Sequence, residues 1–302
     1  MLFFRHLFAY LTISCYNENM ETTFSYYISK SRDINFRHSI THKSSTPLQI
    51  PAETHNLYEL LYIKSTDGGK SFFTIDANIY NVESGDLILV RPHTLHRLTV
   101  NDLTKVPYER YVLQFSPELI TAKDIDLENV FNTLFFKQNE RFFIFNRETL
   151  EKTDVPRYFD EIANICKNEN PHTLFYLISA VLQLSSALYS ARSHKPQPSF
   201  SQKNVHVERI ISYINKNIFT SLNLKTIADD LFLNQYYMSH LFSKHMGISL
   251  KKYINTIKIY KAKELIDKGE SPTNVALHLG FEYYSTFFNA YRSIIGANPT
   301  ER

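Results

Sequence analysis

The chain has 302 residues, of which 43% are hydrophobic and 21% charged, and its formal net charge is +3. These values are typical of a soluble globular protein with enough chain for two domains. Cys15 and Cys166 are the only cysteines, which excludes a disulfide framework and a cysteine-based zinc finger and fits the reducing cytoplasm.

The chain begins with an apolar segment, residues 2–13, that contains Arg5 and His6. It is too short to span a bilayer, and its charge interrupts the apolar core that a signal peptide needs. We therefore predict a cytoplasmic protein with no membrane contact. Met20 is an alternative start, which would leave residues 1–19 untranslated.

Residues 22–120 are predicted to form a small antiparallel β-barrel. Gly68-Gly69 and Gly85-Asp86 mark tight turns, because glycine accepts positive φ without steric cost. Short strand-like runs at close spacing are typical of barrels and sandwiches. The predicted strands are Thr22–Ile28, Tyr58–Ser65, Ser71–Ile75, Leu87–Val90, His96–Val100 and Tyr108–Phe115.

Residues 121–192 are predicted to form a helical dimerisation region, with helices at Pro156–Lys167 and Thr173–Arg192. The second helix carries a wide apolar stripe. The stripe consists of Leu174, Leu177, Ile178, Val181, Leu184, Leu188 and Ala191. It either packs against the barrel or forms a subunit interface, and its width favours the interface of a homodimer. The polar segment 193–204 contains two prolines and is predicted to be a linker.

Residues 205–302 contain one short pattern twice. They also hold 12 Lys and Arg against 8 Asp and Glu, whereas residues 1–204 hold 21 against 22, so a polyanionic partner suits this half alone.

The first copy of the repeated pattern contains Ala228, Leu231, Met238, Leu241, Phe242 and Gly247. The second copy lies 48 or 49 residues later and contains Ala276, Leu279, Phe287, Ala290, Tyr291 and Gly296. Each copy predicts a short helix, a tight turn and a longer helix that ends at glycine. An all-α domain with two helix-turn-helix motifs, and hence binding to double-stranded DNA, follows.

The second helix of each motif should present its outward face to the major groove. Asn234 is a good N-cap for the first such helix, Gln235–Met246, and the second runs from about Tyr284 to Ile295. Base-edge or backbone contacts are predicted for Gln235, Tyr236, Ser239, His240, Ser243, Tyr284, Ser285, Phe288, Asn289 and Arg292. Further DNA contacts are predicted for Lys244, Lys251 and Lys258. Tyr237 is predicted to face inward.

These residues resemble the AraC/XylS family of bacterial transcription regulators over roughly 205–302. The resemblance includes Ala228, Leu241-Phe242, Gly247, Ser249, Tyr253, Ala262, Gly280-Phe281, Phe287, Gly296 and Pro299. It implies two helix-turn-helix subdomains joined by a linker helix, with recognition helices that enter successive major-groove segments. The chain departs from the family at His240, Asn289 and Lys258, where arginine is usual, and at Tyr283, where an acid is common.

Residues 46–117 resemble the cupin-like sensor domain of the same family, which implies a barrel that binds a small effector, commonly a sugar. Effector contacts are predicted for His55, Glu59, Tyr62, Arg91, His93 and His96. Metal-dependent cupins have a His-x-His-x(3,4)-Glu run and a later His. Here Glu53 replaces the first histidine, so His55, Glu59 and His96 are predicted to bind no metal.

The overall α+β organisation predicts a ligand-responsive transcription regulator, with RNA polymerase as a possible further partner and no cofactor. The alternative is a metal-dependent cupin enzyme fused to a DNA-binding module. No Ser/His/Asp arrangement, P-loop or dinucleotide fingerprint indicates another enzyme class, so we predict that the chain is not an enzyme. A constitutive, sequence-independent DNA binder is a third hypothesis, which the sensor-like half disfavours.

Overall fold

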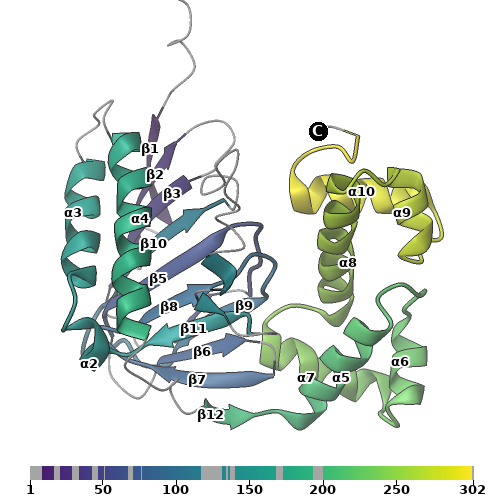
Figure 1. The fold of residues 1–302 in the computed structure, drawn as a ribbon. Helices are drawn as coiled ribbons and strands as arrows, with labels where there is room; N and C mark the ends of the chain where they lie inside the picture. Colours follow the sequence, from purple (N-terminus) through teal and green to yellow (C-terminus); the bar gives the residue numbers. More distant parts are fainter. Residues whose placement is uncertain are drawn as a thin grey trace, which may run out of the picture.

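The computed structural model consists of a β-sheet domain with covering helices and a separate helical domain (Figure 1). It describes residues 9–16, 21–28, 34–42, 47–50, 52–66, 71–75, 77–116, 131–133, 135–136, 140–167, 173–192 and 200–300. The predicted Gly68-Gly69 turn and residues 193–199 of the predicted linker lie outside these ranges. So does the side chain of Leu174.

The first domain is built from two antiparallel sheets. The larger has the order β1 (Ala9–Tyr16), β2 (Glu21–Ile28), β3 (Ile34–Thr41), β10 (Tyr108–Phe115), β5 (Tyr58–Ser65), β8 (Leu87–Val90) and β11 (Phe142–Phe145). The smaller has the order β12 (Phe200–Lys203), β7 (Asn78–Val82), β6 (Ser71–Ile75), β9 (His96–Val100) and β4 (Leu48–Gln49). The predicted antiparallel barrel is confirmed, and five of its six predicted strands have the predicted bounds.

The strands β10, β5 and β8 of the larger sheet carry buried residues on both faces, and strand alternation decides which side chain enters which core. On β5, Leu61 and Ile63 face the smaller sheet, where they join a core with Phe73 and Val112. Leu60 faces the opposite way, into a second core. Because successive side chains of a strand point to opposite faces, one strand supplies two hydrophobic cores.

The outer face of the larger sheet is covered by α3 (Val155–Lys167) and α4 (Thr173–Arg192), which lie side by side in Figure 1. The short helix α2 (Arg147–Leu150) precedes them. The apolar stripe of α4 is buried within this core, with at most 1% exposure at Leu177, Val181, Leu184 and Leu188. The prediction that this stripe forms a subunit interface is therefore wrong, because the broad sheet and α3 already cover it.

A different face of α4 is exposed. Phe175 is 72%, Leu182 53% and Tyr189 47% exposed, and the three residues repeat every seven positions. A spacing of seven places them along one side of the helix, away from the sheet.

Residues 200–203 of the predicted linker form β12, which pairs with β7 in the smaller sheet. Helix α5 (Val205–Lys216) follows after a single residue, Asn204. The Asn204 side chain accepts a hydrogen bond from the backbone N–H of Val207 and caps α5, while its own backbone N–H donates to Ala77 O at 3.0 Å. Asn204 is thus bonded to the first domain through its backbone and to the first helix of the second domain through its side chain.

The second domain is all-α, as predicted. It contains α6 (Leu224–Asp230), α7 (Gln235–Met246), α8 (Leu250–Asp267), α9 (Pro272–His278) and α10 (Tyr284–Ile295). The first half of α8 packs with α5, α6 and α7, while its second half packs with α9 and α10. Helix α8 therefore joins two helix-turn-helix units, each with its own core. Among the described helices, none is long and apolar enough to cross a lipid bilayer.

Candidate functional site

The exposed faces of α7 and α10 carry the residues predicted to meet DNA. Local sequence positions both helices: Asn234 Oδ1 accepts hydrogen bonds from the backbone N–H groups of Tyr236 and Tyr237, and glycines in the left-handed conformation end the helices at 247 and 296. All predicted residues of the two helices are exposed or half-buried, namely Gln235, Tyr236, Ser239, His240, Ser243, Lys244, Tyr284, Ser285, Phe288, Asn289 and Arg292. Lys251 on α8 is exposed as well.

Tyr237 is also exposed, which contradicts the predicted inward orientation. Met238 and Phe242 fill the core position that Tyr237 was expected to share. The ring of Tyr237 instead lies beside His206 of α5, with 6.2 Å between the ring centroids.

Lys258 does not belong to this surface. It is 4% exposed, and its ammonium donates hydrogen bonds to Thr220 O at 2.7 Å and Leu279 O at 2.6 Å. Burial lowers its pKa from 10.5 to about 8. The predicted DNA contact is wrong, because this lysine lies on the buried face of α8 and ties the loop after α5 to the end of α9.

The turn of the first motif contains a residue that sequence reasoning missed. Phe232 has a φ of 56° and is 92% exposed. Positive φ is costly for a bulky side chain, and glycine is the usual residue at such a position. The repeat itself carries the signal, because Gly280 occupies the equivalent place 48 residues later with a φ of 69°.

Three predicted effector residues meet inside the barrel. Glu59 on β5 faces the interior and is 2% exposed. Its Oε2 lies 3.0 Å from His55 Nε2 and accepts a hydrogen bond from Gln114 Nε2 at 2.6 Å, and its Oε1 lies 3.5 Å from His96 Nε2. Glu53 Oε1, at the rim, lies 3.9 Å from the same His96 nitrogen.

The electrostatics of this cluster are dominated by opposite charges in a buried place. Burial alone would raise the pKa of Glu59, but the charge of His96 and the contact with His55 hold it well below its ordinary value. Burial opposes a charge on His96 too, yet the carboxylate of Glu59 raises its pKa to about 9. Glu59 is therefore a carboxylate at neutral pH, and His96 carries a positive charge beside it.

A cavity of about 80 Å³ adjoins the cluster and opens between the two sheets. Its lining includes the cluster's carboxylate and imidazole together with basic and apolar side chains. The lining residues are Arg37, Ile50, Glu53, Glu59, Leu61, Phe73, His96, Arg97, Leu98, Arg110 and Val112. Arg37, Arg97 and Arg110 were not predicted: Arg37 and Arg110 lie on β3 and β10, far from Glu59 in the sequence, whereas Arg97 lies on β9 directly after the predicted His96.

The other three predicted effector residues lie elsewhere. Tyr62 points to the outer face of the larger sheet, where its ring stacks on Phe159 of α3 at 5.2 Å between centroids. Tyr62 and Glu59 are three residues apart on one strand, so they must face opposite sides of the sheet. The prediction that Tyr62 shares a site with Glu59 is wrong for this reason.

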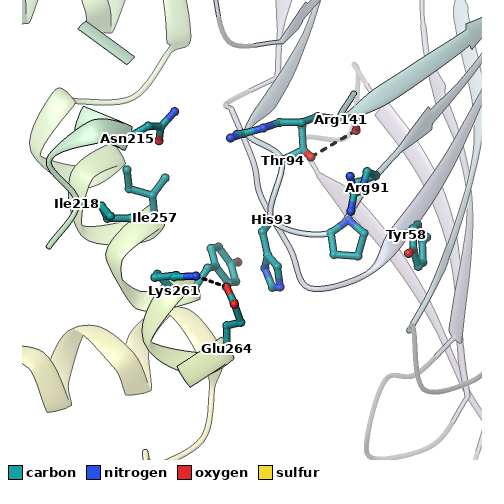
Figure 2. A pocket seen from close by; sticks show the side chains of 12 residues that line it. Tyr58, Arg91, His93, Thr94, Arg141, Asn215, Ile218, Ile257, Lys261 and Glu264 are labelled. Atoms are coloured by element: carbon teal, nitrogen blue, oxygen red, sulfur yellow. Dashed lines mark hydrogen bonds and ion pairs between the residues drawn. The ribbon is translucent and has the colours of Figure 1, made fainter. Parts of the chain in front are cut away.

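Arg91 and His93 line a second, larger cavity of about 430 Å³ between the two domains (Figure 2). Figure 2 shows Arg91, His93 and Arg141 on the barrel side, facing Asn215, Ile257 and Lys261 of the helical domain. They therefore do not join His55, Glu59 and His96 in one pocket. His93 has a φ of 62°, and burial lowers its pKa to about 4, so it is neutral at physiological pH.

The two domains are in direct contact around this cleft. Tyr260 on α8 donates a hydrogen bond to Thr54 O at 2.9 Å, and its ring lies 4.4 Å from that of His93. Arg97, which also lines the barrel cavity, donates from Nη1 to the carbonyls of Lys244 and His245 at the end of α7, at 3.3 and 3.4 Å. A residue of the barrel cavity thus touches the first recognition helix.

The comparison with known proteins agrees with both halves of this architecture. Residues 44–162 match the model of an AraC-like ligand binding domain, and residues 227–302 match that of a helix-turn-helix domain. The chain belongs to the AraC family. The two matched segments coincide with the barrel and its first covering helix, and with the two helix-turn-helix units.

Individual AraC-family relatives are distant. The regulatory protein PocR of Salmonella typhimurium is 28% identical over 41% of this chain, and the match spans only 40% of PocR. The arabinose operon regulatory protein of Escherichia coli is 23% identical over 72% of this chain and 71% of its own length. The solved structure of ToxT from Vibrio cholerae O395 with a bound naphthalenyl-butenoic acid aligns with a TM-score of 0.38 and 16% identity, over 93% of this chain and 97% of that one.

Proposed function

We propose that this AraC-family chain is a sequence-specific DNA-binding transcription regulator that responds to a small-molecule effector. The observation that carries the proposal is the pair of helix-turn-helix units on α8, each with a second helix whose outer face is exposed. The match of the remaining half to a ligand-binding domain supports the response to an effector. RNA polymerase is a further proposed partner.

DNA recognition is proposed to use α7 and α10 together. His240 and Asn289 occupy equivalent positions on these helices and are both exposed. Replacing either by alanine should weaken specific binding by about 1–3 kcal/mol if it touches a base edge. Lys216→Ala, on the exposed side of α5, is the matched control and should have little effect.

The experiment selects bound sequences from random duplex DNA and measures affinities for the selected and a scrambled site. A protected region with two major-groove segments roughly 10 bp apart is expected. Equal affinity for both duplexes would replace the proposal with sequence-independent binding. Substrate turnover by the purified protein would favour the alternative of a cupin enzyme fused to a DNA-binding module.

The effector is proposed to be a sugar or a related metabolite that enters the barrel cavity. A ligand that binds only the folded protein stabilises it by about 2.7 kcal/mol at a hundredfold excess over Kd. A thermal-shift screen of sugars on the full chain should therefore give a hit. Val112→Phe fills the cavity and should abolish the shift, whereas Arg91→Ala, in the cleft between the domains, should retain it.

Arg97 offers a route from the cavity to DNA. An effector that draws its guanidinium into the cavity would remove its hydrogen bonds to the end of α7. Gly247 ends this helix directly against Arg97, where an added Cβ would lie 3.1 Å from the guanidinium. The proposed signal is thus a small displacement of Arg97, because its side chain both lines the barrel cavity and contacts the end of α7.

A homodimer is proposed to form through the exposed face of α4. Phe175, Leu182 and Tyr189 are large apolar side chains in one row on a helix whose opposite side is already packed on the sheet. Exposed apolar rows of this kind mark interaction surfaces, and the seven-residue spacing suits a second helix of the same kind.

A further inference from the structure

We propose that α7 and α10 read A·T base pairs in the major groove, with aromatic rings on the C5-methyl groups of thymine and side-chain amides on adenine. The inference rests on the proposed function, because it names the class of base pair that the same two helices recognise. It is carried by the side chains on the outer face of each helix and by the places of the basic residues along it.

Each recognition helix exposes an aromatic ring in its first turn. Tyr236 of α7 is 80% exposed, and Tyr284 of α10 is 38% exposed. A second ring lies one turn further along each helix. The rings of Tyr236 and His240 are 6.2 Å apart between centroids, and those of Tyr284 and Phe288 are 6.4 Å apart. Both helices therefore present two rings at a spacing of four residues.

These rings lie on the side of each helix that faces away from its core. The core side of α7 is filled by Met238 and Phe242, and that of α10 by Phe287, all of them fully buried. Exposed aromatic rings that gather on one face mark a contact surface. In a helix-turn-helix motif the first residues of the second helix contact base edges, so the rings of the first turn meet the bases.

The chemistry of an aromatic ring selects one feature of the major groove. Thymine alone carries a C5-methyl group there, and apolar side chains recognise this group by direct contact. The hydroxyl of a tyrosine offers a single polar atom. It cannot form the two parallel hydrogen bonds by which a guanidinium recognises guanine O6 and N7. The rings therefore indicate thymine rather than guanine.

The amides beside the rings select the same base pair. Gln235 precedes Tyr236, and Asn289 follows Phe288, and both amide residues are exposed. A side-chain amide donates to adenine N7 and accepts from the adenine N6 amino group, a pattern that the other bases do not present. Adenine pairs with thymine, so the amide and the ring of one helix are both satisfied by A·T pairs.

The basic side chains of the two helices stand at the opposite ends. Helix α7 contains no arginine, and its one lysine, Lys244, lies in the last turn. Arg292 is the only lysine or arginine of α10, and it also lies in the last turn. Arginine and lysine are the usual readers of guanine, but here they lie away from the first turns and are placed for phosphate contacts.

The competing explanation places the rings against the deoxyribose units of the backbone. Such contacts position a protein on DNA and carry no sequence information. The two explanations differ in their dependence on one chemical group, because only a contact with the base edge requires the thymine methyl.

The experiment uses the full chain and the duplex obtained by selection from random DNA. We expect A·T pairs in both major-groove segments of the selected site. Replacing their thymines by deoxyuridine removes only the methyl group, and should weaken binding about fourfold for each contacted thymine. Replacing their adenines by 7-deazaadenine removes the N7 acceptor and should also weaken binding, and Asn289→Ala should abolish this second effect at its segment.

Variants of the two tyrosines assign the methyl contact to a ring. Tyr236→Ala and Tyr284→Ala should each lose the preference for thymine over deoxyuridine in the segment that the altered helix meets. Tyr236→Phe and Tyr284→Phe are the matched controls, because they keep the ring and should keep the preference. Circular dichroism checks the fold of Tyr284→Ala, and Tyr236→Ala tests the proposal on its own because that side chain is largely in solvent.

The proposal is overturned if the contacted positions of a specific site are G·C pairs, or if the deoxyuridine duplex binds as tightly as the thymine duplex. It is also overturned if both alanine variants keep the full preference for thymine. Failure of the proposed function gives a different result, because selection would then yield no common site and all duplexes would bind equally. That result overturns both proposals, whereas the first three overturn only the class of base pair.

Discussion

Phe232 and Gly280 occupy the same place in the two helix-turn-helix units and share one left-handed backbone conformation, with φ values of 56° and 69°. At Gly280 the conformation is accompanied by a close approach of the chain, since an added Cβ would lie 2.6 Å from Ser221 N. At Phe232 the side chain projects into solvent. The same turn is therefore relaxed in one unit and strained in the other.

Replacing Phe232 by glycine should stabilise the protein by about 1 kcal/mol, because glycine adopts positive φ without the steric cost of a Cβ. Urea unfolding of the full chain measures the effect. Gly280→Ala should have the opposite sign, because it adds both backbone strain and a clash. Equal losses of stability in both variants would mean that the exposed ring of Phe232 stabilises its turn.

Lys258→Met should lower the unfolding free energy at pH 7 by about 1–3 kcal/mol, because the carbonyls of Thr220 and Leu279 lose their donor. Lys251→Met, which removes an exposed lysine from the same helix, is the control and should change little.

The same pair of variants tests the pH dependence of stability. The folded chain releases the Lys258 proton near pH 8, whereas the unfolded chain holds it to about 10.5. Between these values the unfolded state binds more protons, so this lysine makes unfolding less favourable as pH rises. The gap between the wild type and Lys258→Met should widen from pH 8 to pH 10, and a constant gap would contradict the lowered pKa.

Leu182→Glu should convert a dimer into a monomer with little loss of stability, because Leu182 lies on the exposed face of α4. Val181→Glu, one residue earlier, should destabilise the fold itself, because it places a charge in the core between α4 and the larger sheet. Sedimentation and thermal melting separate the two effects. A wild-type chain that sediments as a monomer at all concentrations would contradict the proposed interface.

Tyr260→Phe removes one hydrogen bond between the domains and should cost about 0.5–1.5 kcal/mol. Faster hydrogen exchange is expected in the segment around Thr54 and in the middle of α8. Tyr237→Phe, on the exposed face of α7, serves as the control. Exchange that rises equally in both variants would indicate that the Tyr260 contact does not hold the domains together.

Local sequence signals predicted much of this fold. The bounds of β5 follow from a short apolar run and those of β9 from alternating apolar residues. The bounds of α7 follow from helical periodicity with a capping asparagine and a glycine stop, and those of α10 from periodicity and a glycine stop. Strand β3 was missed because its sequence mixes Asn35, Arg37 and His38 with apolar residues. Its place between β2 and β10 nevertheless buries Asn35 and His38. Pairing between distant segments has no local signature.

The errors at the site have equally specific causes. Tyr62 was grouped with Glu59 although strand periodicity places them on opposite faces. Lys258 lies four residues from both Ile254 and Ala262, which marks it as part of the buried face of α8, but its charge suggested a DNA contact. The stripe of α4 was recognised as apolar, yet its sequence does not reveal whether a sheet or a second subunit covers it.

The strand β12 has a consequence for how a dimer would read DNA. A long free tether would let each DNA-binding half settle on target sites at variable separations. Here only Asn204 separates a strand of the barrel sheet from α5, and its backbone is itself bonded to Ala77. The distance between the two halves of a dimer would then be set by the protein's own shape, so inserting a few base pairs between paired target sites should abolish simultaneous occupancy.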